Sequence, residues 1–476
     1  MYTIRIETLG CRLNQIESES IAKLFTDEGY EVNMESVTSK SLVESDTSIC
    51  ILNTCTVTQK AEQKARRIIR LMLQKYPDSV VVVTGCYAQL ASSEIKKIDR
   101  RVCVVPGQIK SRLEKLPRLL KSYLELWAWD PVFFVQRIQE EILSYPIQKK
   151  DFPEQSFKLS TSSFLAHSRA SLKIQDGCNN NCSFCAIHIA RGHSVSILVE
   201  TAILRVKDLE LAGYSEVVIT SVNLGQYRSE YNGRTVGFSD LLRLLLENTK
   251  TIKFRISSIY PELVDSDFCD AVSSQRVQPH FHLSVQSGSD KILTSMNRMY
   301  RAEDVVRACN SLRSVKENPF IACDIITGFP GETEADFEQT MALCKKCNFA
   351  WIHAFPFSER PGTAAVEMKN KVPQSISGER EGRLNAFACQ NKISYINSFV
   401  GKKLNAVLET ARRQNSLVMN KAEYIYHAVT DNFIHCEIKS LKELDNKALV
   451  AVEIKNVLTE RIEKGGEIEA VAEIIY

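Results

Sequence analysis

The sequence predicts an α/β protein made of three successive folded regions. Strand and helix patterns alternate over residues 1–110 and again over residues 165–400, whereas residues 401–476 contain only short strand patterns. Alternation of this kind is typical of parallel sheets covered by helices, and a run of short strands is typical of a small antiparallel barrel. We therefore expect an N-terminal open parallel sheet, a central partial (β/α)6 barrel, and a C-terminal barrel of the OB type.

Composition narrows the class of protein. Of the 476 residues, 44% are hydrophobic and 25% are charged, as in ordinary globular proteins. The formal net charge of +3 is too small to indicate a nucleic-acid partner without a local cluster of basic residues. The 15 cysteines are too few for a disulfide scaffold, and the first residues read as a strand rather than a signal peptide. We therefore expect a cytoplasmic protein whose clustered cysteines bind metal or do chemistry, with no membrane-spanning helix.

The N-terminal region is predicted as alternating strands and helices. The predicted strands are residues 2–8, 47–54 and 79–85, and the predicted helices are residues 14–29 and 59–76. Each strand is followed at once by a cysteine, namely Cys11, Cys55 and Cys86. Because the carboxyl ends of parallel strands share the edge where open sheets bind ligands, we expect these cysteines to lie together. Unrelated core cysteines are the alternative, but that alternative does not explain why each one follows a strand.

The middle of the chain repeats the alternation after an interruption. Residues 111–164 break the pattern and are interpreted as a linker or an insertion. The predicted strands of the barrel are residues 170–176, 216–222, 254–258, 280–286, 321–329 and 351–357. The predicted helices are residues 197–212, 239–248, 262–274, 302–315 and 333–346. In parallel barrels the chemistry lies at the carboxyl ends of the strands.

A second cysteine trio follows the first of these barrel strands. Cys178, Cys182 and Cys185 are separated by three and then two residues in "KIQDGCNNNCSFC". They are buried free thiols, or a zinc site completed by His188 or His193, or three ligands of an iron–sulfur cluster. Structural zinc usually uses two ligand pairs separated by a loop, a form that this run lacks. In a cluster of four irons, three thiolates leave one iron without a protein ligand. That iron is free to bind a small molecule.

This cysteine motif resembles that of the radical S-adenosylmethionine (radical SAM) enzymes. The resemblance implies a [4Fe-4S] cluster on Cys178, Cys182 and Cys185 whose free iron binds the amino and carboxylate groups of SAM. One electron from the reduced cluster then splits the sulfonium and yields a 5′-deoxyadenosyl radical. By the same resemblance, Cys11, Cys55 and Cys86 are interpreted as ligands of a second [4Fe-4S] cluster that also keeps a vacant iron.

A narrower resemblance covers nearly the whole chain except residues 111–164. The chain is similar to the methylthiotransferases, which replace a C–H bond by C–S–CH3. The stretches that carry this resemblance are "TLGCRLNQIESE", "NTCTVT", "TGCYAQ", "KIQDGCNNNCSFC", "RISSIYPE", "HLSVQSGSDKIL", "DIITGFPGETEADF" and "HAFPFSERPGTAA". The first two look most like the branch that methylthiolates C2 of N6-threonylcarbamoyladenosine at position 37 of tRNA.

The resemblance also implies partners and leaves alternatives open. The implied partners are the tRNA anticodon loop, a reductant protein such as flavodoxin or ferredoxin, and a sulfur source. The alternatives are action on isopentenyladenosine-37, action on a ribosomal protein, and a non-catalytic metal-bearing protein that binds RNA. The C-terminal barrel resembles the TRAM domain, which helps relatives to hold RNA. Its 11 basic and 12 acidic residues do not by themselves support that role.

Two further groups of residues are candidates for binding. By resemblance, Phe184 is expected near the adenine of SAM, and Ser284, Gln286 and Gly328 near its methionine or ribose. The last of these belongs to "GFPGET", which as a lone motif fits a plain loop equally well. The predicted helix 59–76 carries six basic side chains against the single acid Glu62. It is either a solvated helix face or a surface that attracts the phosphates of tRNA.

Overall fold

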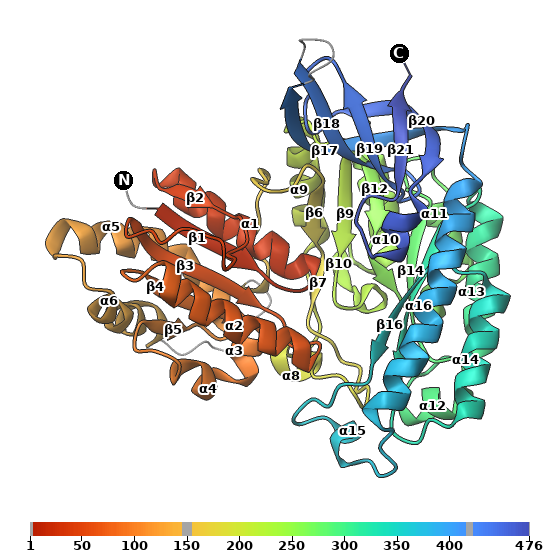
Figure 1. Ribbon diagram of the computed structural model, residues 1–476, viewed down its shortest axis with the longest axis horizontal. Helices are drawn as coiled ribbons and strands as arrows, with labels where there is room; N and C mark the ends of the chain where they lie inside the picture. The colour runs from red at the N-terminus through yellow and green to blue at the C-terminus, as the bar shows by residue number, and fades with distance from the viewer. Residues whose placement is uncertain (1–2, 145–154, 416–421, 476) are drawn as a thin grey trace. The chain divides into compact units, whose positions relative to one another are not determined.

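A computed structural model describes residues 3–144, 155–415 and 422–475, without the side chains of 410–415, 422 and 423 (Figure 1). These residues form two compact units, which are described separately. The first unit combines Met1–Ala166, Lys173–Ile197 and Ser358–Val366. The second combines His167–Leu172, Leu198–Phe357 and Glu367–Tyr476. Both units are therefore built from segments that are far apart in the sequence.

The first unit contains a five-stranded parallel sheet in the order β2-β1-β3-β4-β5 (Figure 1). Its strands are β1 (Thr3–Thr8), β2 (Glu31–Asn33), β3 (Thr47–Thr54), β4 (Val80–Gly85) and β5 (Val102–Val104). Its helices are α1 (Arg12–Asp27), α2 (Gln59–Lys75), α3 (Cys86–Leu90) and α4 (Ser92–Lys96). All strand pairs are parallel, which confirms the predicted open parallel sheet.

The two faces of this sheet bury separate apolar cores. On β3, Ile49 and Ile51 join the core that contains α1, whereas Cys50 and Leu52 join the core that contains α2. This division follows from the alternation of side chains along a strand. Since both faces are covered, the strand reads as a continuous apolar run, as buried parallel strands do.

The segment after β5 is largely helical and packs on the same face of the sheet as α1. It contains η1 (Gly107–Lys115), α5 (Leu116–Leu126), α6 (Pro131–Ile138) and η2 (Gln139–Leu143). Leu116, Leu120, Tyr123 and Phe134 belong to the core that also holds Ile4 of β1. The described part of residues 111–164 thus contributes apolar side chains to the N-terminal core. Among the described residues, the structure contains no helix with the length and apolarity needed to cross a bilayer.

The second unit contains the strands of a partial parallel barrel, as predicted. Two sheets in the orders β12-β9-β6 and β13-β14-β15-β16 supply them. The strands are β6 (Ala170–Lys173), β9 (Glu216–Thr220), β12 (Lys253–Ile256), β13 (Ser258–Ile259), β14 (His280–Gln286), β15 (Phe320–Thr327) and β16 (Trp351–Pro356). The covering helices are α9 (Val199–Leu211), α10 (Phe238–Asn248), α11 (Ser266–Val272), α12 (Asp290–Ser295), α13 (Ala302–Val315), α14 (Glu334–Cys347) and α16 (Gln374–Asn397).

Shorter elements complete both units. They are β7 (Gln175–Asp176), α8 (Ile187–Arg191), β8 (Val195–Ser196), η4 (Leu224–Gln226), β10 (Ser229–Tyr231), β11 (Arg234–Val236), η5 (Pro261–Leu263), α15 (Ala364–Glu367) and α17 (Thr459–Glu463). Helix α16, which was not predicted, packs along β16 (Figure 1).

The C-terminal residues form a closed barrel in the order β17-β18-β19-β21-β20, which confirms the predicted small barrel. Its strands are β17 (Lys403–Asn415), β18 (Ala422–Thr430), β19 (His435–Ser440), β20 (Leu449–Val457) and β21 (Ala470–Ile474). The turn between β18 and β19 contacts the amino-terminal ends of the parallel strands. Phe433 in this turn lies 4.1 Å from the ring centre of His280, and Arg255 donates to the carbonyl oxygen of Asp431.

Candidate functional site

Three cysteines lie at the carboxyl ends of three neighbouring strands in the first unit. Cys11 follows β1 and precedes α1, Cys55 directly follows β3, and Cys86 directly follows β4. Since β1, β3 and β4 are adjacent in the sheet, the structure brings the three residues to one edge. Cys55 and Cys86 are buried and Cys11 is exposed, so solvent reaches the group on the side of Cys11.

The turn before Cys11 packs directly on Cys55. Gly10 has a φ of +97°, and a Cβ atom there would lie 2.5 Å from Cβ and 2.8 Å from Sγ of Cys55. Only glycine accepts both this backbone conformation and this close approach. The "TLGC" stretch therefore needs its glycine in order to bring the first two thiols together.

Asn14 ties the turns around these cysteines to each other. Its Nδ2 donates to the carbonyl oxygens of Leu9 at 2.9 Å and of Thr54 at 3.0 Å, and the side chain is completely buried. Leu9 precedes Cys11 by two residues and Thr54 immediately precedes Cys55. One amide thus binds two backbone carbonyls from turns that are about 45 residues apart in the sequence.

The environment of the trio disfavours free thiolates. Burial, together with the neighbouring Cys11 and Cys86, raises the pKa of Cys55 to about 12. Burial also raises the pKa of Cys86, although Arg191 and Lys110 oppose this effect. Thiols that neighbour one another in an apolar setting are neutral until a metal cation replaces their protons. The trio is therefore suited to a positively charged metal centre.

The second trio lies in the loop between β7 and α8. Cys178 and Cys182 are buried and Cys185 is partly exposed. The backbone N–H of Asn180 donates to Sγ of Cys178, and that of Ile187 donates to Sγ of Cys185, both at 3.4 Å. Amide donors of this kind favour the thiolate form that a metal requires. The loop thus prepares its sulfur atoms as metal ligands.

The described residues contain no assembled site for a single metal ion. Across the described residues, no three His, Cys, Asp or Glu side chains converge closely enough to coordinate one metal ion. The zinc interpretation with His188 or His193 therefore finds no assembled ligand set in the described residues.

A buried set of charged side chains lies beside both trios, and sequence analysis did not identify it. The set comprises Glu17, Lys110, Lys173, Asp176 and Arg191, all within the first unit, and these side chains line a small cavity. Glu17 is completely buried and pairs with all three cations. Those cations lower its pKa to about 2 against the opposing effect of burial. Three of these residues stand in the quoted "IESE" and "KIQDGC" stretches, but charged residues in a sequence are usually read as surface residues.

Three of the four residues predicted to contact SAM lie in the second unit. Ser284 and Gln286 are buried in β14, and Gly328 directly follows β15. Gln286 has a φ of +70°, a left-handed conformation that is unusual for a residue other than glycine. Such strain is retained mainly at functional sites. Phe184 lies in the first unit, between Cys182 and Cys185, and is partly exposed.

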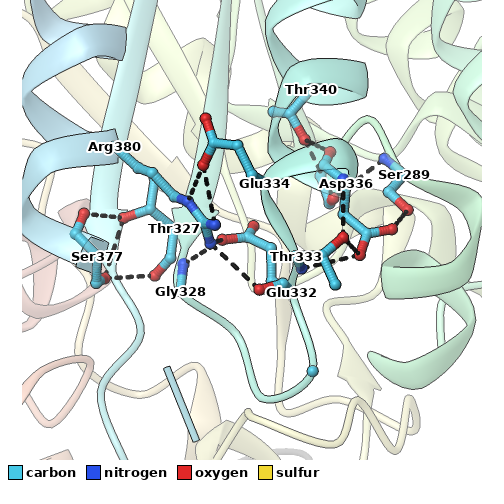
Figure 2. A network of polar contacts seen from close by, with 12 residues as sticks. Ser289, Thr327, Gly328, Glu332, Thr333, Glu334, Asp336, Thr340, Ser377 and Arg380 are labelled. Carbon is cyan, nitrogen blue, oxygen red and sulfur yellow. Dashed lines mark hydrogen bonds and ion pairs between the residues drawn. The ribbon is translucent and has the colours of Figure 1, made fainter. Parts of the chain in front are cut away.

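The "GFPGET" loop is held by helix α16. Figure 2 shows Arg380 reaching toward Glu332 and Glu334, with Ser377 beside Thr327. Arg380 donates to Glu332 Oε2 at 2.7 Å, and the same oxygen accepts from the Gly328 N–H at 2.7 Å. A Cβ atom at Gly328 would lie 2.5 Å from Ser377 Oγ, so this glycine is required by packing against the helix. The loop thus has a structural reason for its glycine, whatever it binds.

Comparison with known proteins matches two parts of the chain to protein families. Residues 3–107 match "Uncharacterized protein family UPF0004", and residues 172–344 match "Radical SAM superfamily". The threonylcarbamoyladenosine tRNA methylthiotransferase MtaB of Treponema pallidum is 44% identical, over 86% of this chain and 91% of that protein. The chain belongs to the MtaB-type threonylcarbamoyladenosine tRNA methylthiotransferases. The resemblance noted in the sequence is thereby confirmed.

More distant members of the methylthiotransferase family match over a similar length. The MtaB of Thermotoga maritima is 33% identical, over 93% of this chain and 96% of that protein. The MtaB of Bacillus subtilis is 32% identical, over 95% of this chain and 94% of that protein. Membership of the radical SAM superfamily implies one [4Fe-4S] cluster and SAM.

Proposed function

We propose that this chain converts N6-threonylcarbamoyladenosine at position 37 of tRNA into its 2-methylthio derivative. The single observation that carries the proposal is the presence of two cysteine trios in one compact unit of a chain from this family. The three relatives described above are all named threonylcarbamoyladenosine tRNA methylthiotransferase. That agreement favours this branch over action on isopentenyladenosine-37 or on a ribosomal protein.

In this proposal each trio holds one [4Fe-4S] cluster. Cys178, Cys182 and Cys185 hold the cluster that binds SAM, and Cys11, Cys55 and Cys86 hold the second cluster. When bound, the two clusters and SAM supply the electron, the hydrogen-abstracting radical, the methyl group and the site of sulfur attachment. The chain contributes the thiolates, the amide donors to sulfur and the burial that excludes water. The amide donors from Asn180 and Ile187 support the assignment of Cys178 and Cys185 as ligands.

Four residues are proposed to bind SAM. They are Phe184, Ser284, Gln286 and Gly328. The strained backbone of Gln286 supports a role in ligand binding, because its cost must be offset by surrounding structure. The evidence for Gly328 is the weakest of the four, since its contact with Ser377 already explains why glycine is required.

The tRNA anticodon loop is proposed to approach helix α2. Lys60, Lys64, Arg67 and Arg70 are exposed on this helix, which begins four residues after Cys55. Exposed cations beside a reactive site attract the phosphate backbone, and an unstacked loop base offers its edge for chemistry. The basic and aromatic residues Arg412, Arg413 and Tyr426 of the C-terminal barrel are also candidates for RNA contact. They add little support, because Tyr426 is completely buried and the structure does not describe the side chains of Arg412 and Arg413.

Two further partners belong to the proposal by chemical necessity. Cleavage of SAM needs an electron, which a reductant protein such as flavodoxin or ferredoxin would supply. The methylthio group needs a sulfur atom from a separate source. A non-catalytic metal-bearing protein that binds RNA remains the alternative of a different class, and cleavage of SAM by the reduced protein separates it from the enzyme.

Iron analysis and nucleoside analysis together test the proposal. The C178A/C182A/C185A and C11A/C55A/C86A variants, reconstituted without oxygen, should each lose about half of the iron and sulfide if two equal clusters are present. Only the first variant should also lose all cleavage of SAM. Mass spectrometry of tRNA from cells that lack the protein should show loss of the methylthio nucleoside. Unchanged methylthiolation in those cells, or full iron content in either variant, would contradict the proposal.

A further inference from the structure

A single guanidinium connects the loop of the second trio to the turns of the first. Arg191 Nη1 donates to Asp176 Oδ1 at 2.9 Å and to Oδ2 at 3.1 Å, and Arg191 Nη2 donates to Asn14 Oδ1 at 2.8 Å. Asp176 precedes Cys178 by two residues. Asn14 in turn donates to the carbonyl oxygens beside Cys11 and Cys55. The hydrogen bonds therefore connect Asp176, two residues before Cys178, to the backbone one and two residues before Cys55 and Cys11.

This connection is buried along its whole length. Asn14 is 0%, Asp176 6% and Arg191 7% exposed, and all three belong to the first unit. Buried hydrogen bonds that involve charged groups are stronger and more costly to break than exposed ones. Breaking the connection is therefore costly.

The geometry requires arginine. The guanidinium is planar and directs two nitrogens at two different partners, whereas a lysine ammonium is a single point charge. Asn14 is equally specific, because it accepts from Arg191 while it donates to Leu9 and Thr54. Neither side chain has a substitute that preserves all of these bonds.

The buried set of charged side chains carries a net positive charge. Lys110, Lys173 and Arg191 outnumber the two carboxylates of Glu17 and Asp176. An excess of buried positive charge needs a negative neighbour. Three thiolates bound to a metal cluster supply negative charge at the adjoining edge of the sheet. The positive charge of the set would therefore be balanced when the cysteines hold their clusters.

We propose that Arg191 is the positioning residue that sets the separation between the two cysteine trios. The inference rests on the proposed function, in which both trios hold clusters. Cleavage of SAM requires only the cluster on Cys178, Cys182 and Cys185. Methylthio transfer also requires the substrate carbon to reach the sulfur held at the cluster on Cys11, Cys55 and Cys86. A displacement between the trios should therefore uncouple the two events, because misplacement by about 1 Å can lower a rate about 100-fold.

The test compares three variants of the full chain, reconstituted without oxygen. R191K keeps the positive charge but cannot bind Asp176 and Asn14 through two separate nitrogens. N14A removes the side chain that binds Arg191, Leu9 and Thr54. R255K is the matched control, because Arg255 is also a buried arginine that binds one glutamate, Glu216, through two nitrogens at 2.7 and 2.8 Å. Arg255 belongs to the second unit, whereas both trios belong to the first.

The first readout is the magnetic interaction between the two reduced clusters, measured by pulsed electron paramagnetic resonance. R191K and N14A should keep wild-type iron content but change this interaction, and R255K should not. The second readout is 5′-deoxyadenosine released per methylthio group transferred. This ratio should rise about 10- to 100-fold in R191K and N14A, and remain at the wild-type value in R255K.

Three results would overturn the inference. The first is an unchanged magnetic interaction in both R191K and N14A. The second is a loss of half the iron in R191K, which would assign Arg191 to holding a cluster rather than to spacing. The third is an equal change in R255K. A wild-type protein that cleaves SAM without modifying tRNA would refute the proposed function alone, because the magnetic readout would still decide the role of Arg191.

Discussion

Arg360 holds the turn after Cys55 against helix α2 by donating through Nη1 to the carbonyl oxygen of Thr56 at 3.2 Å and to Glu62 Oε1 at 2.6 Å. Its side chain is 3% exposed and that of Glu62 is 18% exposed. Because Glu62 also accepts from Thr56 Oγ1 at 2.6 Å, the three residues form one closed group. A segment from beyond β16 thus takes part in shaping an edge of the N-terminal sheet.

We predict that R360A lowers the free energy of local unfolding at this edge by about 3 kcal/mol, since removal of one partner leaves the other charge buried and unpaired. Hydrogen exchange of the β3 and α2 amides measures this change, and alkylation of Cys55 in the metal-free protein should become faster. R360K should retain part of the stability. Wild-type exchange rates in R360A would show that the contact contributes nothing.

We predict that the K64Q/R67Q/R70Q variant binds tRNA more weakly and with a weaker dependence on salt. If all three side chains contact phosphate, the slope of log K against log salt concentration should fall by about 2. Binding titrations of unmodified tRNA at several salt concentrations measure the slope. The control is R307Q/K346Q/K464Q, which removes three exposed cations of the second unit. An equal loss of slope in the control would mean that the attraction is not located on α2.

We predict that E210Q loosens the segment between α10 and β12 at neutral pH. The Glu210 carboxylate accepts from the backbone N–H groups of Lys250, Thr251 and Ile252. These hydrogen bonds lower its pKa to about 2 although burial opposes them. A carboxyl whose pKa is lowered on folding stabilises the folded state above its unfolded pKa, and this stabilisation is lost as pH falls toward the folded value.

The difference in amide exchange at Lys250–Ile252 between wild type and E210Q should therefore be full at pH 7 and should narrow as pH falls from about 4.5 toward 2. At neutral pH, E210Q should lower the free energy of local unfolding of this segment by about 1–2 kcal/mol, as removal of a charged helix cap does. E247Q changes an exposed carboxylate on α10 and should have no such effect. A difference that widens on acidification would have the wrong sign for this explanation.

We predict that G328A is destabilising and that S377G partly rescues it. The φ of +72° at Gly328 costs a residue with a side chain about 1–2 kcal/mol. The added methyl group also meets Ser377 Oγ at 2.5 Å and Cβ at 2.6 Å. In G328A/S377G the contact disappears while the backbone cost stays. A double-mutant cycle in urea should therefore show a favourable coupling, and strict additivity would contradict the packing explanation.

Sequence patterns predicted the positions of Cys11, Cys55 and Cys86 because parallel strands align their carboxyl ends at one edge. Helix α16 was not predicted, since few apolar side chains mark its buried face: Ser377 and Arg380 are buried there beside Leu384, Ala388 and Ile396. The three-residue strands β2 and β5 are too short to show a period.

The buried charged set was missed for a different reason. Glu17, Lys110 and Arg191 come from parts of the chain that are far apart, and nothing local shows that they meet. Their pairing depends on tertiary structure alone. Composition and periodicity report where a side chain prefers to be, but the partners that permit burial of a charge become visible only in the assembled fold.

The discontinuous build of the first unit affects how it is made on the ribosome. Ser358–Val366 belong to this unit, yet they are synthesised after most of the parallel barrel. In a nascent chain that has already formed the N-terminal sheet, the turn beside Cys55 cannot bind Arg360 until that residue has been synthesised. Cys55 therefore lacks this cover until Ser358–Val366 have been synthesised. Oxidative stress should damage newly made protein more than mature protein.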